Sequence, residues 1–240
     1  MKREQRKLDH IRYALELGDG DRKTGLDDVH FLHNCLTPVE PDMTDIRTQI
    51  GDLVLPAPVF IDAITGGSRQ VAEINRNLAK AAKQAGVAMA VGSQYGAVKT
   101  DIGADTYTVV REENPDGIVF ANVSALAAPE EAEKAVSMIR ANALEIHLNV
   151  TQELIMPEGD KHFAAIRKNL IRLKDAADVP VIIKETGCGM ASAQILELQA
   201  MGFTCFNIAG FGGTSFAAIE AARNLNKRYE KFADWGIPTA

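Results

Sequence analysis

The sequence predicts an α/β fold built on a parallel sheet, and two observations carry this prediction. From about Pro58 onward, short apolar runs alternate with amphipathic helical segments, and successive runs begin roughly 25 to 35 residues apart, the length of one strand–helix unit. Polar residues or glycine follow every run, at the same point of each unit. Such alternation is typical of a parallel sheet with helices outside it.

Six apolar runs are the predicted strands, at residues 59–62, 88–92, 118–122, 144–149, 181–184 and 205–209. Amphipathic segments between them predict helices at residues 71–85, 130–141, 161–176 and 192–201. Gly86 suits the C-terminal cap of the first helix, and Pro129 suits the first turn of the second.

Units of this length favour a TIM (β/α)8 barrel, which needs eight of them in about 250 residues. Residues 58–240 supply units 1 to 6, so we expect a barrel truncated after about six βα units. An open six-stranded parallel sheet is the alternative, and it is less favoured because it leaves unpaired edges. Residues 1–57 read differently, as one charged helix at about 4–17 followed by irregular or antiparallel structure. We expect them to form an N-terminal extension packed on the barrel.

Composition narrows the classes of partner. The formal net charge of −6, from 26 basic and 32 acidic residues, gives no electrostatic reason to expect nucleic acid or an anionic membrane. No stretch approaches the ~20 consecutive apolar residues of a membrane span. The three cysteines stand apart without a CxxC pair, which argues against a disulfide framework or a zinc ribbon. We therefore expect a cytoplasmic protein that binds neither nucleic acid nor membranes.

Polar side chains follow the predicted strands, where chemistry sits in barrels of this kind. Lys184 closes an apolar strand and shares a face with Ile182, so it should point into the barrel mouth. A buried ammonium needs an anionic or electron-rich partner, such as the N1–O2 edge of a flavin. The alternative is a lysine that reaches out to solvent. Thr65-Gly66-Gly67 suits close backbone approach to a flat cofactor, or it is only a turn.

The richest segment is residues 147–153. His147 and Asn149 alternate along the strand and face the same way, and Gln152 and Glu153 follow on the loop. Glu153, with or without Glu158, could hold Mg²⁺ beside a diphosphate through oxygen ligands. The alternative is a solvated carboxylate. The only concentrated positive charge that could meet a diphosphate lies in the opening run that contains Arg6 and Lys7.

Taken in order, the motifs point to a family. They are Arg6-Lys7 with His10, Thr24 to Asp28, Ile64-Thr65-Gly66-Gly67, Val91 to Gln94, Ala121-Asn122, His147-Leu148-Asn149, Gln152-Glu153, Pro157 to Asp160, Val181 to Glu185 and Gly210 to Thr214. In this set the chain resembles the type 2 isopentenyl-diphosphate isomerases along essentially all of its length. Each motif is weak alone, whereas the ordered set is specific.

The resemblance implies an FMN-bound TIM barrel that interconverts isopentenyl and dimethylallyl diphosphate in isoprenoid biosynthesis. It also implies a reduced flavin, NADPH as the reductant, Mg²⁺, and a homo-oligomer (a tetramer or octamer in the family). By the same resemblance, Arg6, Lys7 and His10 bind substrate, with Arg6 and Lys7 reaching over the site from the same or a neighbouring subunit. His147, Asn149 and Gln152 line the substrate as catalytic residues, and Glu153 binds the metal. The implied FMN contacts are Ala63, Ile64, Thr65, Ser93, Asn122, Lys184 and Thr214.

Three departures from the family pattern stand out. Ile64 replaces the usual methionine before Thr-Gly-Gly, and Ser124 replaces the glycine after Asn122-Val123. Units 7 and 8, whose loops often hold a cofactor phosphate, are missing, so weak FMN binding or an inactive chain is expected. The rival readings are an FMN-dependent oxidoreductase of the TIM-barrel type and a non-catalytic truncated fragment. The first needs a base or nucleophile that the sequence does not offer at the expected strand ends.

Overall fold

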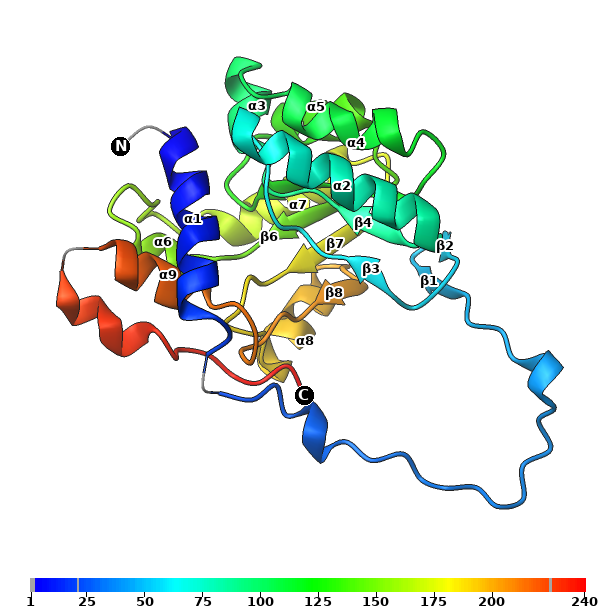
Figure 1. The fold of residues 1–240 in the computed structure, drawn as a ribbon. Coiled ribbons are helices and arrows are strands. Elements are labelled where there is room, and N and C mark those ends of the chain that lie inside the picture. The colour runs from blue at the N-terminus through cyan, green and yellow to red at the C-terminus, as the bar shows by residue number, and fades with distance from the viewer. Residues whose placement is uncertain (1–2, 21, 225) are drawn as a thin grey trace.

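The computed structural model describes residues 3–20, 22–224 and 226–240. Met1 and Lys2 of the opening basic run lie outside the described residues. The centre of the protein is a parallel sheet whose strands follow chain order (Figure 1). Its members are β3 (Phe60–Ile61), β4 (Ala88–Ala90), β5 (Val119–Ser124), β6 (Ala143–His147), β7 (Val181–Lys184) and β8 (Cys205–Asn207). All six predicted strands are confirmed, with small shifts of their ends.

The sheet curls around an interior. In a flat sheet, neighbouring strands lie about 4.8 Å apart, so β3 and β8 at its two edges would be separated by roughly 24 Å. Instead, Asp62, which follows β3, has its Oδ2 atom 3.2 Å from Asn207 Nδ2 of β8 and 3.4 Å from Lys184 Nζ of β7. The fold is therefore a partial α/β barrel of six βα units. Among the described strands, β3 and β8 are not paired with each other, so the sheet keeps the open edges of the alternative prediction but is curled as expected for part of a barrel.

Alternation along the strands divides the apolar core into two layers. Outward residues such as Ala121, Val123 and Ile146 pack against the surrounding helices. Inward residues such as Phe120 and Ile182 form a smaller cluster inside the barrel. This inner cluster also contains Leu55 and occupies the N-terminal half of the strands. The C-terminal half of the interior is left for polar side chains.

Leu55 belongs to a hairpin that covers the N-terminal end of the barrel. Strand β1 (Thr48–Ile50) pairs antiparallel with β2 (Leu53–Leu55), which confirms the antiparallel structure expected before the barrel. The turn at Gly51 approaches Pro180, the residue before β7. This end of the interior is therefore apolar and filled.

Helices surround the sheet (Figure 1). The predicted helices are α2 (Arg69–Ala85), α5 (Pro129–Ile139), α7 (Ile166–Ala176) and α8 (Ser192–Ala200), and α7 begins five residues later than expected. Gly86 caps α2 in a left-handed conformation, and Pro129 begins α5. Not predicted were α3 (Tyr95–Thr100), α4 (Asp105–Glu113) and α6 (Val150–Ile155). These three follow polar strand ends that read as loops. The last helical segments are α9 (Phe216–Arg223) and the 3-10 helix η3 (Lys227–Phe232).

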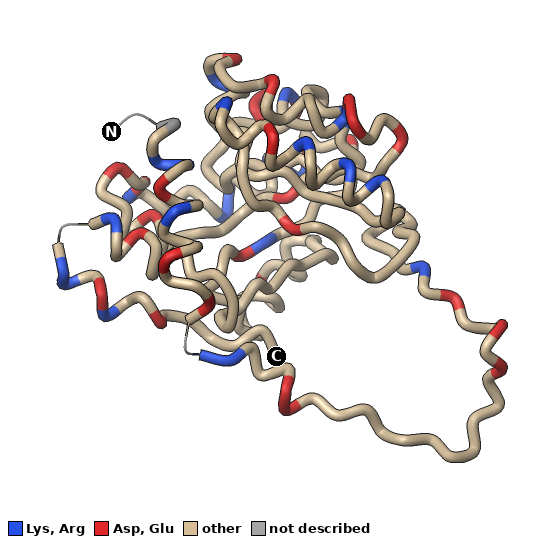
Figure 2. Tube along the Cα trace, in the orientation of Figure 1, with Lys and Arg blue, Asp and Glu red and all other residues tan. Residues whose placement is uncertain are grey.

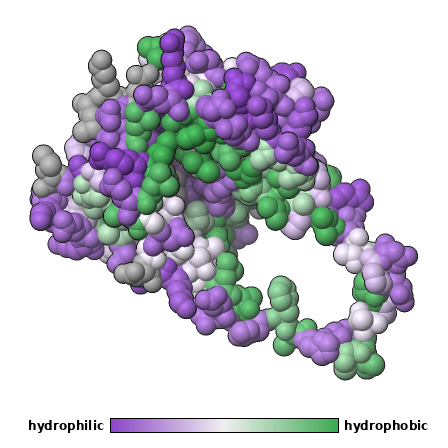
Figure 3. Space-filling view, in the orientation of Figure 1, coloured by the Kyte–Doolittle hydropathy of each residue, from purple (hydrophilic) through white to green (hydrophobic). Residues whose placement is uncertain are grey.

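The N-terminal region contains one packed helix and one exposed arm. Helix α1 (Arg3–Leu17) lies beside α9, whereas residues 29–46 run away from the body as an extended segment (Figure 1). The short 3-10 helix η1 (Leu26–Asp28) precedes this arm, and a second one, η2 (Pro41–Met43), lies within it. Phe31 and Leu32 are 100% and 97% exposed, and apolar and polar residues alternate in patches along the arm (Figure 3).

Basic and acidic residues are interspersed along α1 and the outer helices (Figure 2). Among the described helices, none combines the length and apolar character that crossing a bilayer requires.

Candidate active site

A cavity of about 930 Å³ opens at the C-terminal ends of the strands. That volume is at the upper end of the range typical of small-molecule sites. All fourteen side chains predicted from the sequence line it: Arg6, Lys7, His10, Ala63, Ile64, Thr65, Ser93, Asn122, His147, Asn149, Gln152, Glu153, Lys184 and Thr214. They come from five strand ends and from α1, α6 and the loop before α9. The structure thus brings together residues that the sequence separates by up to 208 positions.

Lys184 forms part of the cavity floor. Lys184 is 4% exposed. Its ammonium group lies 3.4 Å from Asp62 Oδ2 and donates to the Glu185 carbonyl oxygen at 3.0 Å. The prediction that Lys184 points into the barrel mouth is confirmed, and the alternative of a solvent-reaching lysine is wrong. Asp62 partly balances its charge, and three ammonium hydrogens leave room for a further acceptor.

Beside Lys184 lies a row of polar side chains on the interior faces of β5 and β6. Asn122 Nδ2 donates to Glu145 Oε2 at 2.9 Å, and Asn122 Oδ1 lies 2.8 Å from His147 Nδ1. Burial raises the pKa of Glu145 to about 7, against the opposing effect of the Lys184 charge. Burial lowers the pKa of His147 to about 3, and Lys184 adds to that effect. His147 is therefore neutral at pH 7.

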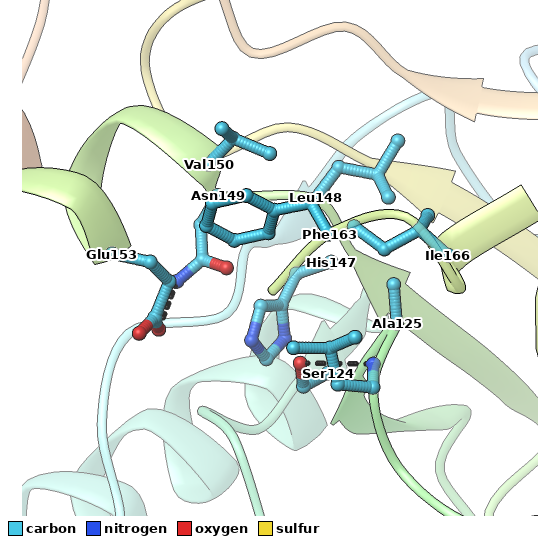
Figure 4. A pocket seen from close by; sticks show the side chains of 10 residues that line it. Ser124, Ala125, His147, Leu148, Asn149, Val150, Glu153, Phe163 and Ile166 are labelled. Atoms are coloured by element: carbon cyan, nitrogen blue, oxygen red, sulfur yellow. Dashed lines mark hydrogen bonds between the residues drawn. The ribbon is translucent and has the colours of Figure 1, made fainter. Parts of the chain in front are cut away.

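The segment after β6 places three predicted residues on one turn. Asn149 precedes α6, and its Nδ2 atom donates to Gln152 Oε1 at 3.0 Å and to Glu153 Oε1 at 2.9 Å. Glu153 Oε2 accepts from the backbone N–H of Asp160 at 2.8 Å. Figure 4 shows this turn above His147, with Asn149 and Glu153 hydrogen-bonded to each other. The Glu153 carboxylate is thereby fixed at the cavity wall.

Glu153 does not sit in a cluster of protein ligands. Across residues 3–20, 22–224 and 226–240, no group of three or more histidine, cysteine, aspartate or glutamate side chains could hold a metal ion. Glu158, its suggested partner, also lines the cavity and is 3.1 Å from Arg223. A metal at Glu153 would therefore take most of its ligands from water and a bound anion, which is the usual mode of Mg²⁺ beside phosphates.

Helix α1 of the same chain forms the opposite wall of the cavity. His10 Nε2 lies 2.8 Å from Glu220 Oε1 on α9, and burial lowers the pKa of His10. Glu220 Oε1 also lies 3.4 Å from Gln152 Nε2, and its other oxygen pairs with Arg223. Arg6 is 3.8 Å from Glu158. These contacts hold the basic face of α1 over the site.

Thr65 presents a polar group that a bound ligand or a water molecule could satisfy. Its Oγ1 atom is buried without a hydrogen-bond partner among the described residues, although Thr65 lines the cavity. An orphaned buried hydroxyl costs free energy unless a ligand or water satisfies it. Together, Thr65, Asn122 and Lys184 line the cavity with the donors and acceptors that a polar ring system could use.

The two glycines after Thr65 are required by close packing within the protein. A Cβ atom on Gly66 would meet the Tyr107 ring at 2.1 Å, and Gly67 has a φ of +85°. Neither glycine lines the cavity. Within the protein, the close approach at these glycines is to Tyr107 of α4, whose hydroxyl donates to the Ser93 carbonyl at 2.6 Å.

Sequence reasoning missed several polar residues around the site: Asp62, Glu145, Asn207, Glu220 and Arg223. Alternation would have found the first three, because each lies two residues from an inward-facing neighbour on its strand. No local signal marks Glu220 and Arg223, because their burial depends on how α9 packs against α1.

Comparison with known proteins adds independent information. No family model matches the chain. Over 241 residues the chain is 47% identical to a Bacillus cytotoxicus protein and 46% identical to a Bacillus mycoides protein, both named isopentenyl-diphosphate delta-isomerase. Each match covers 100% of this chain and 68% of the relative. A solved structure of a mutant of an active chimera of (S)-mandelate dehydrogenase matches with a TM-score of 0.51 at 15% identity, over 85% of this chain and 69% of that one. The last similarity concerns the fold alone.

Proposed function

Because the chain belongs to the isopentenyl-diphosphate delta-isomerase family, we propose that its cavity interconverts isopentenyl and dimethylallyl diphosphate with reduced FMN and Mg²⁺. Membership in the family makes the protein an isomerase. The cofactor, the metal and the residue roles are the parts that we add. The proposed reaction would belong to isoprenoid biosynthesis.

One observation carries the proposal. Lys184 and Asn122 on the strand ends, Glu153 on α6, and Arg6 with Lys7 on α1 all line a single cavity. A reaction on an alkene diphosphate beside a flat cofactor needs cofactor-binding, metal-binding and diphosphate-binding side chains next to one another. Had the groups been on different faces of the molecule, the proposal would have failed.

The residues present fit a flavin. Lys184 supplies a buried cation for the electron-rich N1–O2 edge, Asn122 and Ser93 supply amide and hydroxyl groups, and the orphaned Thr65 hydroxyl supplies a further partner. Ala63, Ile64 and Thr214 complete the predicted contacts. Reduced flavin supplies, when bound, an acid–base group beside the double bond, and NADPH is the proposed source of its electrons.

Charged side chains line the part of the cavity where the diphosphate of the substrate would bind. Arg6 and Lys7 would meet the diphosphate from α1, and Glu153 would bind the Mg²⁺ that the diphosphate also ligates. The fixed orientation of Glu153, which accepts from Asn149 and from the Asp160 backbone, lowers the entropy lost when the ion binds.

Gln152, His147 and Asn149 line the cavity near the proposed position of the alkene. Gln152 is neutral and is held between Asn149 and Glu220, so we assign it the positioning of substrate or the relay of a proton. His147 is uncharged and contributes hydrogen bonds only. His10 binds substrate from α1 beside Glu220.

Conversion of isopentenyl diphosphate by the protein, with FMN reduced by dithionite or NADPH and with Mg²⁺ present, tests the proposal directly. We expect product only after flavin reduction, and none with 5-deazaflavin. Lys184→Met should weaken FMN binding by about 10- to 100-fold, because a charge-assisted hydrogen bond contributes about 1.5–3 kcal/mol. Lys134→Met, which alters a surface lysine on α5, is the matched control.

Two outcomes would contradict the proposal. Full turnover with oxidised flavin or with 5-deazaflavin removes the role of the reduced ring. Oxidation of a 2-hydroxy acid with bleaching of the flavin absorbance favours the FMN-dependent oxidoreductase, and a folded but colourless and inert protein favours the non-catalytic fragment.

We further propose that the protein is cytoplasmic and assembles into a homo-oligomer. The exposed apolar residues of the arm at 29–46, Phe31 and Leu32 above all, support self-association. Light scattering checks the assembly state, and a monomeric mass across the micromolar range would refute the oligomer.

A further inference from the structure

The polar row inside the barrel is connected in a defined order. In the β5–β6 ladder, Asn122 stands opposite Glu145, and Ser124 stands opposite His147. Asn122 therefore lies between Glu145 and His147, which are two residues apart on the same face of β6. Its amide uses both ends, with Nδ2 2.9 Å from Glu145 Oε2 and Oδ1 2.8 Å from His147 Nδ1.

The direction of these hydrogen bonds follows from the chemistry of the groups. An ionised carboxylate only accepts, so Glu145 requires the NH₂ end of the Asn122 amide to face it. The carbonyl end must then face His147, and a carbonyl oxygen also only accepts. His147 Nδ1 must therefore carry the hydrogen. Because a neutral imidazole has one N–H, Nε2 keeps a lone pair.

We propose that Glu145 is a positioning residue that orients the Asn122 amide and thereby holds His147 in the tautomer with hydrogen on Nδ1. The Nε2 atom of His147 makes no hydrogen bond with the described residues, and His147 lines the cavity. The result is a hydrogen-bond acceptor on the cavity wall at a residue that would otherwise favour the opposite tautomer. A second-layer carboxylate that fixes the tautomer of a histidine is a recurrent arrangement around functional imidazoles.

The surroundings of Glu145 keep this arrangement in place. Residue Glu145 is fully buried, with Lys184 of β7, Asp62 after β3, Asn122 of β5 and Asn207 of β8 as the polar groups that face it. Its Oε2 atom accepts from Asn122, and the Asn207 amide adds a weaker stabilising contact, whereas Oε1 has no partner with good hydrogen-bond geometry among the described residues. Above pH 7 Glu145 is ionised, and the amide has one favourable orientation.

The consequence for ligand recognition rests on the proposed function, whereas the tautomer does not. With an Nε2 lone pair on the wall, His147 selects a ligand group that donates a hydrogen, an N–H or O–H, at that position. A ligand that presents an acceptor there would be repelled, because its lone pair would point at the lone pair of His147 Nε2. The tautomer can be measured in the protein without cofactor or substrate, so a failed isomerase assay leaves this inference open to its own test.

The test is nuclear magnetic resonance of the protein with ¹⁵N-labelled histidine at pH 8, using two-bond correlations to tell the protonated ring nitrogen from the unprotonated one. The chain has five histidines, so a His147→Gln spectrum assigns the signal. We expect Nδ1 to be protonated and Nε2 unprotonated, with the Nδ1–H tautomer in excess by about tenfold or more, as a hydrogen bond within a charged network implies. A wild-type His147 with hydrogen on Nε2 would overturn the inference by itself.

Two variants separate positioning from packing. Glu145→Met keeps the chain length and removes the acceptor, and we expect it to abolish the excess of the Nδ1–H tautomer. Adding Asn122→Asp to that variant gives His147 a direct carboxylate partner, and we expect the excess to return. Ile182→Val, a change in the same interior layer, should leave the tautomer as in the wild type. An unchanged tautomer in folded Glu145→Met, or no return in the double variant, would overturn the assignment of Glu145.

Discussion

Two glutamates of this protein are equally buried, at 0% exposure, and their surroundings differ completely. Glu220 on α9 is paired with Arg223 and accepts from His10 and Gln152. Glu145 on β6 accepts from Asn122, with the Asn207 amide and the Lys184 charge close by, and its second oxygen has no partner with good hydrogen-bond geometry among the described residues. Through its contact with His10, Glu220 holds α1 against α9 over the cavity. Glu145 lies beneath the cavity and faces into the barrel.

The difference shows that burial of a carboxylate does not by itself fix its effect on stability. A buried charge with a matching guanidinium is held by its partner, and removal of either partner leaves an uncompensated charge. A buried carboxylate that has amide partners but no cation in direct contact gains too little to offset its desolvation, so its neutral form is favoured. The two sites should therefore respond in opposite directions when their charge is changed.

The largest expected effect is at the helix site. Arg223→Met should lower the free energy of unfolding by about 3–5 kcal/mol, because it leaves buried Glu220 without its guanidinium and frees α1, which Arg223 also holds through Asp9. Urea denaturation monitored by circular dichroism measures the change. A loss below 1 kcal/mol would mean that the pair contributes no more than a surface pair.

The barrel site should behave in the opposite way. The pKa of Glu145 is about 7 in the folded protein, against an ordinary value of 4.5, so the folded state binds the proton more tightly than the unfolded state. The free energy of unfolding therefore falls as pH rises from 4.5 to 7 and then stays level. Glu145→Gln removes this penalty and should stabilise the protein at pH 8 by up to about 3 kcal/mol. The gain should shrink toward zero as pH approaches 4.5. Urea midpoints at both pH values check it, and a destabilised variant at pH 8 would contradict the comparison.

The smallest effect is expected at a half-exposed ion pair, which calibrates the other two. Lys134 Nζ lies 2.7 Å from Asp101 Oδ1 between α5 and the end of α3. Solvent screens both groups, so Lys134→Met should change the free energy of unfolding by less than about 1 kcal/mol. The same denaturation protocol applies, and a large loss here would show that charge changes of any kind destabilise this fold.

The sequence predicted the part of the site that strands carry. Lys184 and His147 close their strands, and Asn122 lies near the end of its own. Parallel strands bring their carboxyl ends to one edge, so convergence follows from the periodicity of the chain. Glu145 obeys the same alternation and was missed only because a run of apolar neighbours hides it. Glu220 and Arg223 lie on a helix with no polar motif, and nothing in the local pattern distinguishes a buried pair from a solvated one.

What the amino-acid sequence determined by itself was the α/β class, the six strands and the set of residues at their ends, because side-chain alternation and turn chemistry are local properties. Tertiary structure alone decided the curl that brings Asp62 to Asn207, the docking of α1 over the cavity, and the pKa values of Glu145 and His147. These depend on which side chains from distant segments exclude water from one another. No window of the sequence contains that information.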